Sequence, residues 1–183
     1  MKHAIVIGGT GMLQEASAWL NRQGYQLSVV ARNEARLASL GRILEDPEAY
    51  TPVSLDYKNT EVLREAVRNL QKKHSPADLI VAWIHSTAPG ALRAVIREVD
   101  QQQSSDWRLI HVLGSSTSLE AIRQKIDVPA SCAYQQVQLG FVRENSRSRW
   151  LTHREISQAV IGSMGSNNAV TVVGILEPWE ERP

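Results

Sequence analysis

The feature that most constrains the fold is a short apolar run, Ala4 to Ile7, that ends at a glycine-rich turn. The turn contains Gly8, Gly9 and Gly11, and a helical pattern runs from about Gly11 to Gln23. Glycines in a turn between a strand and a helix let a phosphate approach backbone N–H groups that a Cβ would otherwise block. Strand, glycine turn and helix in this order open a dinucleotide-binding βαβ unit.

The glycine pattern is incomplete, which leaves two interpretations open. Gly9 and Gly11 fit the first two glycines of G-x-G-x-x-G, but Gln14 stands at the third position, and it also ends the frame that begins at Gly8. The third glycine normally lets the helix pack closely on the strand. The turn is therefore either a phosphate-binding turn or a tight connection that binds no ligand. As a phosphate-binding turn, it would use Gly8, Gly9, Thr10, Gly11 and Met12.

Apolar runs with strand character alternate with helical patterns along the rest of the chain. The later strands are expected at 26–31, 51–55, 78–84, 107–113, 133–142 and 169–174, and the later helices at 34–44, 59–74, 91–103, 119–126 and 152–164. The polar segment 143–149 is expected to be a loop. The run 78–84 is apolar on both faces, which is typical of a central parallel strand. The alternation predicts an α/β fold, a three-layer doubly wound parallel sheet of about seven strands in the order 3-2-1-4-5-6-7.

Length and composition narrow the class of protein. A chain of 183 residues suits a single domain, so we expect residues 1–183 to form one dinucleotide-binding domain. The net charge of +1 gives no reason to expect nucleic acid or a membrane surface as partner, and no stretch approaches the roughly 20 apolar residues that span a bilayer. The one cysteine, Cys132, excludes an internal disulfide. We expect a cytoplasmic protein without a metal site.

Ligands of a doubly wound sheet bind at the carboxyl ends of its strands. The sequence places at that edge Gly8 to Met12 after the first strand, Arg32 after the second, Asp56 after the third, His85, Ser86 and Thr87 after the fourth, Ser115 and Ser116 after the fifth, and Arg143 after the sixth. We expect His85 and Ser86 to contact a bound cofactor.

Arg32 indicates which dinucleotide the site prefers. A site for NAD usually has an acidic side chain here, which accepts hydrogen bonds from the ribose hydroxyls. A guanidinium matches a 2′-phosphate instead, so Arg32 favours NADP(H) over NAD(H), with Arg36 one turn further on. The alternative is a solvated arginine at the start of a helix. Asp56 has two interpretations of equal weight, an acceptor for the adenine amino group or the cap of a turn.

With these residues in place, the chain resembles the short-chain dehydrogenase/reductase superfamily, above all its atypical members that open with GGTG-type turns. The resemblance covers nearly the whole chain in layout, and Gly8 to Met12, Arg32 and Asp56 match specific binding positions. It implies an NAD(P)-binding Rossmann fold, a small-molecule substrate that is often a carbonyl, and assembly into homo-oligomers, either dimers or tetramers.

The family's catalytic set is a serine after the fifth strand and a Tyr-x-x-x-Lys pair on the next helix. Ser115 or Ser116 stands at the serine position, but the pair is missing because Tyr134 is followed at the fourth place by Gln138. Tyr134 also lies on an expected strand, where residues four apart are separated by about 13 Å. The usual acid is therefore absent.

The remaining candidates for acid–base work are His85, Ser115, Ser116 and Tyr134. Imidazole titrates near neutrality, so His85 suits an acid beside the nicotinamide, although it equally suits a histidine that only hydrogen-bonds its own loop. His111 and His153 are expected to be structural.

Three hypotheses for the function follow. The first is an NADP(H)-dependent oxidoreductase that acts on a small carbonyl or alcohol with unorthodox acid–base residues. The second is a non-catalytic NADP(H)-binding redox sensor or regulatory protein, which the missing Tyr-Lys pair favours. The third is a cofactor-free Rossmann scaffold that acts through protein partners, which Gln14 favours.

Overall fold

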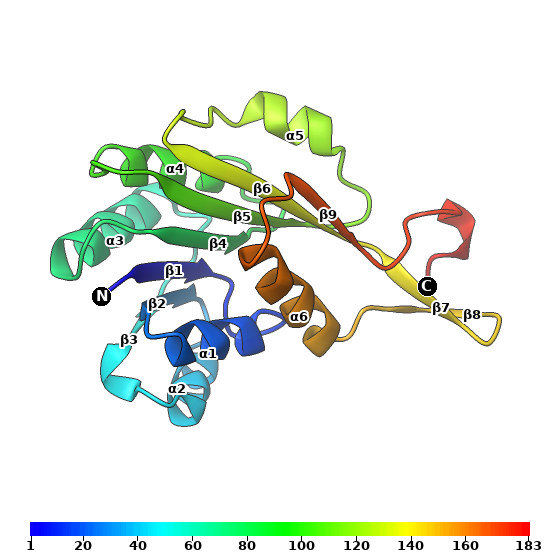
Figure 1. The fold of residues 1–183 in the computed structure, drawn as a ribbon, viewed down its shortest axis with the longest axis horizontal. Helices are drawn as coiled ribbons and strands as arrows, with labels where there is room; N and C mark the ends of the chain where they lie inside the picture. The colour runs from blue at the N-terminus through cyan, green and yellow to red at the C-terminus, as the bar shows by residue number, and fades with distance from the viewer.

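The computed structural model describes all 183 residues and has a seven-stranded parallel sheet at its centre, with helices on both faces (Figure 1). The strands of the sheet are β1 (His3–Ile7), β2 (Gln26–Ala31), β3 (Tyr50–Ser54), β4 (Leu79–Trp83), β5 (Trp107–Leu113), β6 (Cys132–Leu139) and β9 (Val170–Val173). The helices are α1 (Gln14–Arg22), α2 (Glu34–Ile43), α3 (Thr60–Lys73), α4 (Ala91–Asp100), α5 (Leu119–Lys125) and α6 (His153–Met164), with short 3₁₀ helices at Pro47–Ala49 and Trp179–Glu181. The sheet order β3-β2-β1-β4-β5-β6-β9 confirms the predicted doubly wound architecture.

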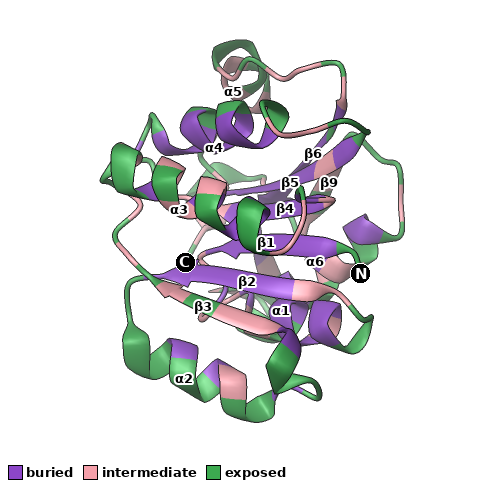
Figure 2. Cartoon of the chain, turned by 90° about the vertical axis from the view of Figure 1, so that its left-hand side faces the viewer, coloured by how far each residue is buried: buried purple, intermediate pink, exposed green.

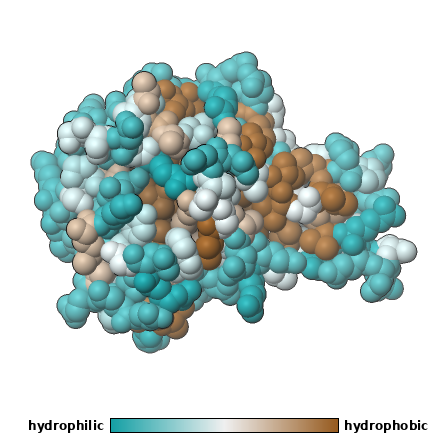
Figure 3. Space-filling model, viewed as in Figure 1, coloured by the Kyte–Doolittle hydropathy of each residue, from teal (hydrophilic) through white to brown (hydrophobic).

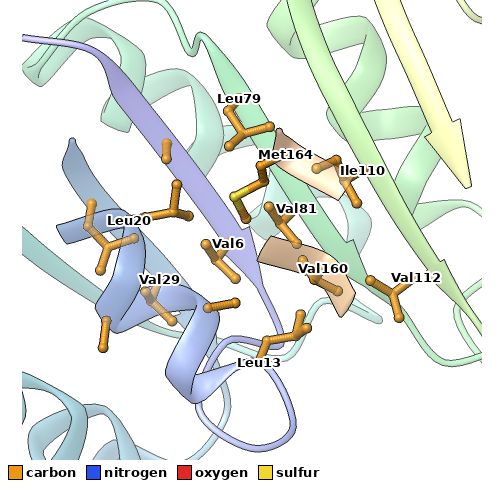
Figure 4. Close-up of a cluster of buried hydrophobic side chains, with 14 of the residues drawn as sticks. Val6, Leu13, Leu20, Val29, Leu79, Val81, Ile110, Val112, Val160 and Met164 are labelled. Atoms are coloured by element: carbon orange, nitrogen blue, oxygen red, sulfur yellow. The ribbon is translucent and has the colours of Figure 1, made fainter. Parts of the chain in front are cut away.

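The sheet separates two hydrophobic cores, because successive side chains of a strand point to opposite faces. Val6 of β1 belongs to the core that α1, α2 and α6 cover, whereas its neighbours Ile5 and Ile7 belong to the core beneath α3 and α4. Figure 4 shows Leu13, just before α1, beside Val160 of α6 in the first of these cores. The central strands are buried along almost their whole length, and α2 is largely exposed (Figure 2).

The first helix begins later than its pattern predicts, at Gln14 rather than near Gly11. Residues 8–13 form a wound turn instead, which we call the glycine turn. Gly8 has a φ of +84°, a conformation that glycine adopts without strain, and a Cβ there would lie 2.8 Å from the carbonyl oxygen of Trp83. The turn is therefore shaped by close contact with β4 as well as by the two elements it joins.

The strand predicted at 133–142 is present as β6 over residues 132–139, but the predictions for the residues that follow were wrong. The expected strand 133–142 is divided at Gly140, where a Cβ would overlap the backbone oxygen of Ile175. The expected loop 143–149 is instead an antiparallel hairpin of β7 (Phe141–Glu144) and β8 (Arg147–Trp150), which projects from the body of the protein (Figure 1). Its turn residues Asn145 and Ser146 have φ of 49° and 64°, as a tight hairpin turn requires.

The other element boundaries agree with the predicted ones to within a few residues. The helix predicted at 59–74 is α3, capped by the Asn59 side chain, which accepts a hydrogen bond from the Val62 amide. The helix predicted at 152–164 is α6, and Thr152 and Glu155 form a capping box at its start. None of the helices combines the length and the apolar character needed to cross a membrane.

Candidate functional site

The glycine turn lies at the carboxyl end of β1, and its glycines have different neighbours. The Gly8 amide donates to Val30 of β2 at 2.9 Å, which anchors the turn. Gly9 is buried, and a Cβ on it would lie 2.8 Å from Ser17 Oγ and from side-chain carbons of Val6 and Val29. Gly11 is the opposite case, because nothing lies within 4 Å of where its Cβ would be. The fold itself requires the first two glycines, whereas Gly11 leaves an open face.

The partly exposed residues of this turn, Thr10, Gly11 and Met12, have backbone amides that are available to an anion. The N–H groups from Thr10 through Leu13 donate to no acceptor within the chain, and Leu13, at the N-cap position of α1, makes no side-chain capping bond. Unpaired amides at a helix N-terminus favour a phosphate group through hydrogen bonds and the helix dipole. The residues present therefore fit the pyrophosphate of a dinucleotide.

Arg32 and Asp56 lie beyond the ends of the neighbouring strands β2 and β3. Arg32 is exposed, and its guanidinium has no ion pair or hydrogen bond within the protein; only its carbonyl oxygen is engaged, by Ser54 Oγ at 3.3 Å. Asp56 caps a turn, since its Oδ1 accepts from the Lys58 amide at 3.0 Å and its carbonyl oxygen accepts from the Asn59 amide at 3.0 Å. The turn cap, one of the two interpretations of Asp56, is thus formed.

The loop after β4 exposes His85, Ser86 and Thr87. When Nδ1 of His85 carries no proton, it accepts a hydrogen bond from the Thr87 amide at 3.3 Å. The amide of His85 donates to the hydroxyl of Tyr57 at 3.1 Å, so Tyr57 holds this loop from the end of β3. The sequence analysis missed Tyr57, although its place directly after Asp56 was a usable signal.

The loop after β5, residues 114–118, carries Ser115 and Ser116, and we call it the serine loop. Gln138 of β6 is buried, and its side-chain amide donates to the carbonyl oxygens of Thr117 at 2.8 Å and Gly114 at 3.4 Å. The hydroxyl of Ser115 accepts a hydrogen bond from Arg182 Nη1 at 2.9 Å, whereas Ser116 is exposed. Gln138 was noticed in the sequence only as the residue that replaces a lysine, and Arg182 was not noticed.

The C-terminal segment 176–183 returns to this edge of the sheet. The guanidinium of Arg182 stacks on the ring of Trp179, and its buried Nε has no hydrogen-bond partner. Arg143 of β7, which the sequence placed at this edge, forms an ion pair with Glu181 at 2.9 Å. The segment is thus tied both to the serine loop and to the hairpin.

Tyr134 is not brought to the carboxyl edge. It lies near the start of β6, opposite Leu109, and its buried hydroxyl is hydrogen-bonded to Nδ1 of His111 at 2.9 Å. Burial lowers the pKa of His111 to about 4 and raises the pKa of Tyr134 well above its usual range. We therefore leave Tyr134 out of the candidate site. No cluster of three His, Cys, Asp or Glu side chains has the geometry to hold a metal ion.

Comparison with known proteins adds the fold family. The sequence matches no family model and no curated protein. A structure of an actinorhodin polyketide ketoreductase variant with NADPH is similar over 94% of this chain and 95% of its own, with a TM-score of 0.68 and 13% identity. The chain has the fold of the short-chain dehydrogenases/reductases. An alcohol dehydrogenase from the archaeon Thermococcus sibiricus, complexed with 5-hydroxy-NADP, covers 96% of both chains at 15% identity and a TM-score of 0.68.

A third similar structure is the short-chain glucose/ribitol dehydrogenase from Brucella melitensis, at 10% identity and a TM-score of 0.71 over 93% of this chain and 94% of its own. The likeness in fold to the short-chain dehydrogenases/reductases, inferred from the layout of the chain and from Gly8 to Met12, Arg32 and Asp56, is thus confirmed. Where the short-chain dehydrogenase pattern has a helix with Tyr-x-x-x-Lys, this chain has α5, which contains no tyrosine. None of the residues of α5 is buried.

Proposed function

We propose that the 183 residues form one NADP(H)-binding domain that acts as an oxidoreductase on a small carbonyl or alcohol substrate. One observation carries the proposal: the unpaired amides from Thr10 through Leu13 lie at the edge of the sheet where the free guanidinium of Arg32 also stands. Backbone amides suit the pyrophosphate, and a guanidinium suits the 2′-phosphate. The similar structures that contain NADPH or 5-hydroxy-NADP support this choice of cofactor.

Side chains from neighbouring loops would bind the cofactor and the substrate and supply the proton. When bound, NADPH supplies the hydride. In its protonated form, His85 would donate the proton of its exposed Nε2 to the substrate oxygen and be left neutral, with the remaining proton on Nδ1, 3.2 Å from Thr87 Oγ1. The free hydroxyl of Ser116 would hold the same oxygen, while Ser86 would contact the cofactor and Asp56 would contact the adenine through its remaining oxygen. Ser115 would join them only when it is released from Arg182.

A second candidate is a non-catalytic NADP(H)-binding sensor. The observation that favours it is the state of the expected catalytic groups: Ser115 is bonded to the chain's own Arg182, and Tyr134 is buried away from the edge. Such a protein would keep the nucleotide site without a functioning acid.

Nucleotide binding tests both candidates first. Fluorescence titration should show NADPH binding, and Arg32→Ala should weaken NADPH by roughly tenfold or more, because a charge-assisted contact with the 2′-phosphate is lost, while NADH changes little. Arg42→Ala is the matched control, since Arg42 is another exposed arginine without an ion pair. Equal losses for both nucleotides would contradict the 2′-phosphate assignment, and no binding at millimolar levels would eliminate both candidates.

A panel of carbonyl substrates then separates the enzyme from the sensor. If the protein is an oxidoreductase, NADPH oxidation should depend on an added carbonyl, and both His85→Ala and Ser116→Ala should lower kcat while NADPH still binds. Turnover that survives both substitutions unchanged would show that the acid lies elsewhere. Nucleotide binding without turnover on any carbonyl would favour the sensor.

We also propose that the protein forms a homo-oligomer. The outer edge of β9 has no partner strand, and Val170, Val172 and Ile175 are exposed there. Figure 3 shows hydrophobic residues gathered toward β9 and the base of the hairpin. Light scattering on the purified protein at several concentrations would decide this, and a monomer at every concentration would contradict it.

A further inference from the structure

Helix α6 contacts the glycine turn through one buried serine. The helix lies beside α1 on one face of the sheet (Figure 1). Ser157 is 1% exposed, and its hydroxyl donates to the carbonyl oxygen of Met12 at 2.7 Å. The Ser157 hydroxyl oxygen also accepts a hydrogen bond from the amide of Ala16 at 3.2 Å. A single side chain thus bridges the turn to the first turn of α1, from more than 140 residues away in the sequence.

This contact supplies what α1 lacks. The first amides of a helix have no partner within the helix and are usually satisfied by the side chain at its N-cap. Leu13 occupies that position and has no polar atom in its side chain. Ser157 satisfies the third amide of the helix in its place, while the amides from Thr10 through Leu13 stay unpaired.

Ser157 is itself held in place by the start of α6. Thr152 and Glu155 form a capping box there, and the carboxylate of Glu155 is also gripped by both terminal nitrogens of Arg149, each at 2.9 Å. The guanidinium of Arg149 holds the pKa of Glu155 at about 2, far below its usual range, so the pair stays charged at neutral pH. These contacts hold the start of α6, and with it the Ser157 hydroxyl, in one position beside the glycine turn.

We propose that Ser157 is a positioning residue for the cofactor site, which keeps the glycine turn in the shape that presents its free amides to a pyrophosphate. The proposal rests on the proposed function. Without the hydroxyl, the partly buried Met12 carbonyl and the buried Ala16 amide would be left unpaired, and the turn would rearrange to satisfy them. That rearrangement would disturb the free amides that bind the phosphates.

The pattern of loss distinguishes this role from the role of Arg32. The pyrophosphate is common to NADPH and NADH, so Ser157→Ala should raise the Kd of both nucleotides by the same factor, about tenfold. Arg32→Ala should instead act on NADPH alone. A substitution that merely destabilises the protein would lower the melting temperature without changing the Kd of the folded molecules.

Ser163→Ala provides the matched control. Ser163 is a buried serine of the same helix whose hydroxyl donates only to Ala159, one turn back in α6. Both variants are titrated with NADPH and NADH at a temperature where each is fully folded. In parallel, hydrogen–deuterium exchange is measured without nucleotide, and Ser157→Ala should speed exchange in residues 10–16 while Ser163→Ala leaves that segment unchanged.

The outcomes separate this inference from the proposed function. If Ser157→Ala binds both nucleotides as tightly as Ser163→Ala does, the inference is overturned even though nucleotide binding stands. If the unaltered protein binds neither nucleotide, the proposed function fails, and exchange alone decides the role of Ser157. Faster exchange confined to residues 10–16 would then support its hold on the turn, and unchanged exchange would overturn it.

Discussion

The glycine turn and the serine loop lie at the same edge of the sheet but have opposite hydrogen-bonding states. In the glycine turn, the amides from Thr10 through Leu13 have no acceptor in the protein. In the serine loop, carbonyl oxygens are bound by Gln138 and the hydroxyl of Ser115 is bound by Arg182. The first loop offers free groups to a ligand, whereas much of the second is engaged by the chain itself.

The difference follows from which groups each loop uses. A pyrophosphate is bound by backbone amides, and a turn of glycines fixes their direction without needing side chains. A substrate is bound by side chains, and polar side chains near other polar groups pair with them. Each loop is nevertheless held from within the fold by a distant buried side chain, Ser157 in one case and Gln138 in the other. The predictions below test this contrast.

The largest effect is expected inside the glycine turn. Gly9→Ala would place a Cβ 2.8 Å from three side-chain atoms and should cost about 3 kcal/mol of unfolding free energy. Gly11→Ala meets no atom of the protein, so it should leave stability nearly unchanged and weaken NADPH binding instead. Urea unfolding and NADPH titration of both variants measure this. If Gly11→Ala bound NADPH normally, the open face would not be where the phosphates bind.

A loss of stability of similar size is expected at acidic pH, and it comes from His111, which belongs to neither loop. Since the pKa of His111 is about 4 in the folded protein and about 6.5 when unfolded, the unfolded state binds more protons between these values. Stability should therefore be constant above about pH 6.5 and fall by about 3 kcal/mol as the pH drops toward 4.

His111→Gln isolates this contribution in urea unfolding at a series of pH values. The variant should lose most of the slope below pH 6.5, and the slope that remains should come partly from His3 and His74, whose pKa values burial also lowers. A slope as steep as in the unaltered protein would show that His111 titrates normally. NADPH binding at neutral pH should not change, because His111 pairs with Tyr134 and not with either loop.

A smaller effect is expected at the inner support of the serine loop. Gln138→Ala removes a buried side chain and the donor to Thr117 and Gly114, and it should cost about 2 kcal/mol, because partly buried carbonyl oxygens lose their partner. The side chain of Gln138 is hydrogen-bonded to the serine loop and not to the glycine turn, so the Kd for NADPH should stay the same. Urea unfolding and NADPH titration check the two parts separately. A matching loss of nucleotide affinity would mean that the two loops are coupled.

The smallest effect is expected at the outer contact of the same loop. Arg182→Ala frees the hydroxyl of Ser115, and loss of this partly buried hydrogen bond should cost about 1 kcal/mol. The melting temperature should therefore fall by a small amount, while hydrogen exchange in residues 114–118 increases only slightly. If Arg182→Ala destabilised the protein more than Gln138→Ala, the C-terminal segment rather than β6 would be the main support of the loop.

Local patterns were sufficient to predict most of the fold. The alternation of strands and helices depends on residues close together in the sequence, and it is present. The Asn59 cap and the Thr152 capping box of the structure are local features in the same sense. The hairpin at 141–150 was missed because Gly140 interrupts the strand only through its contact with Ile175, which lies far along the chain. The alternation of apolar and polar residues is the same on both sides of such a break, so it does not reveal where one strand ends and the next begins.

The sequence by itself determined the glycine turn, the order of the sheet and the edge at which Arg32, His85 and Ser115 lie, because these follow from local periodicity and from the shared direction of parallel strands. Only the tertiary structure decided which polar groups there are free. Tyr134 lies near the start of β6, away from the carboxyl edge, and is therefore outside the candidate site. Ser115 is hydrogen-bonded to Arg182, and Ser157 contacts the glycine turn. Pairing between distant residues depends on packing in three dimensions, which no local pattern records.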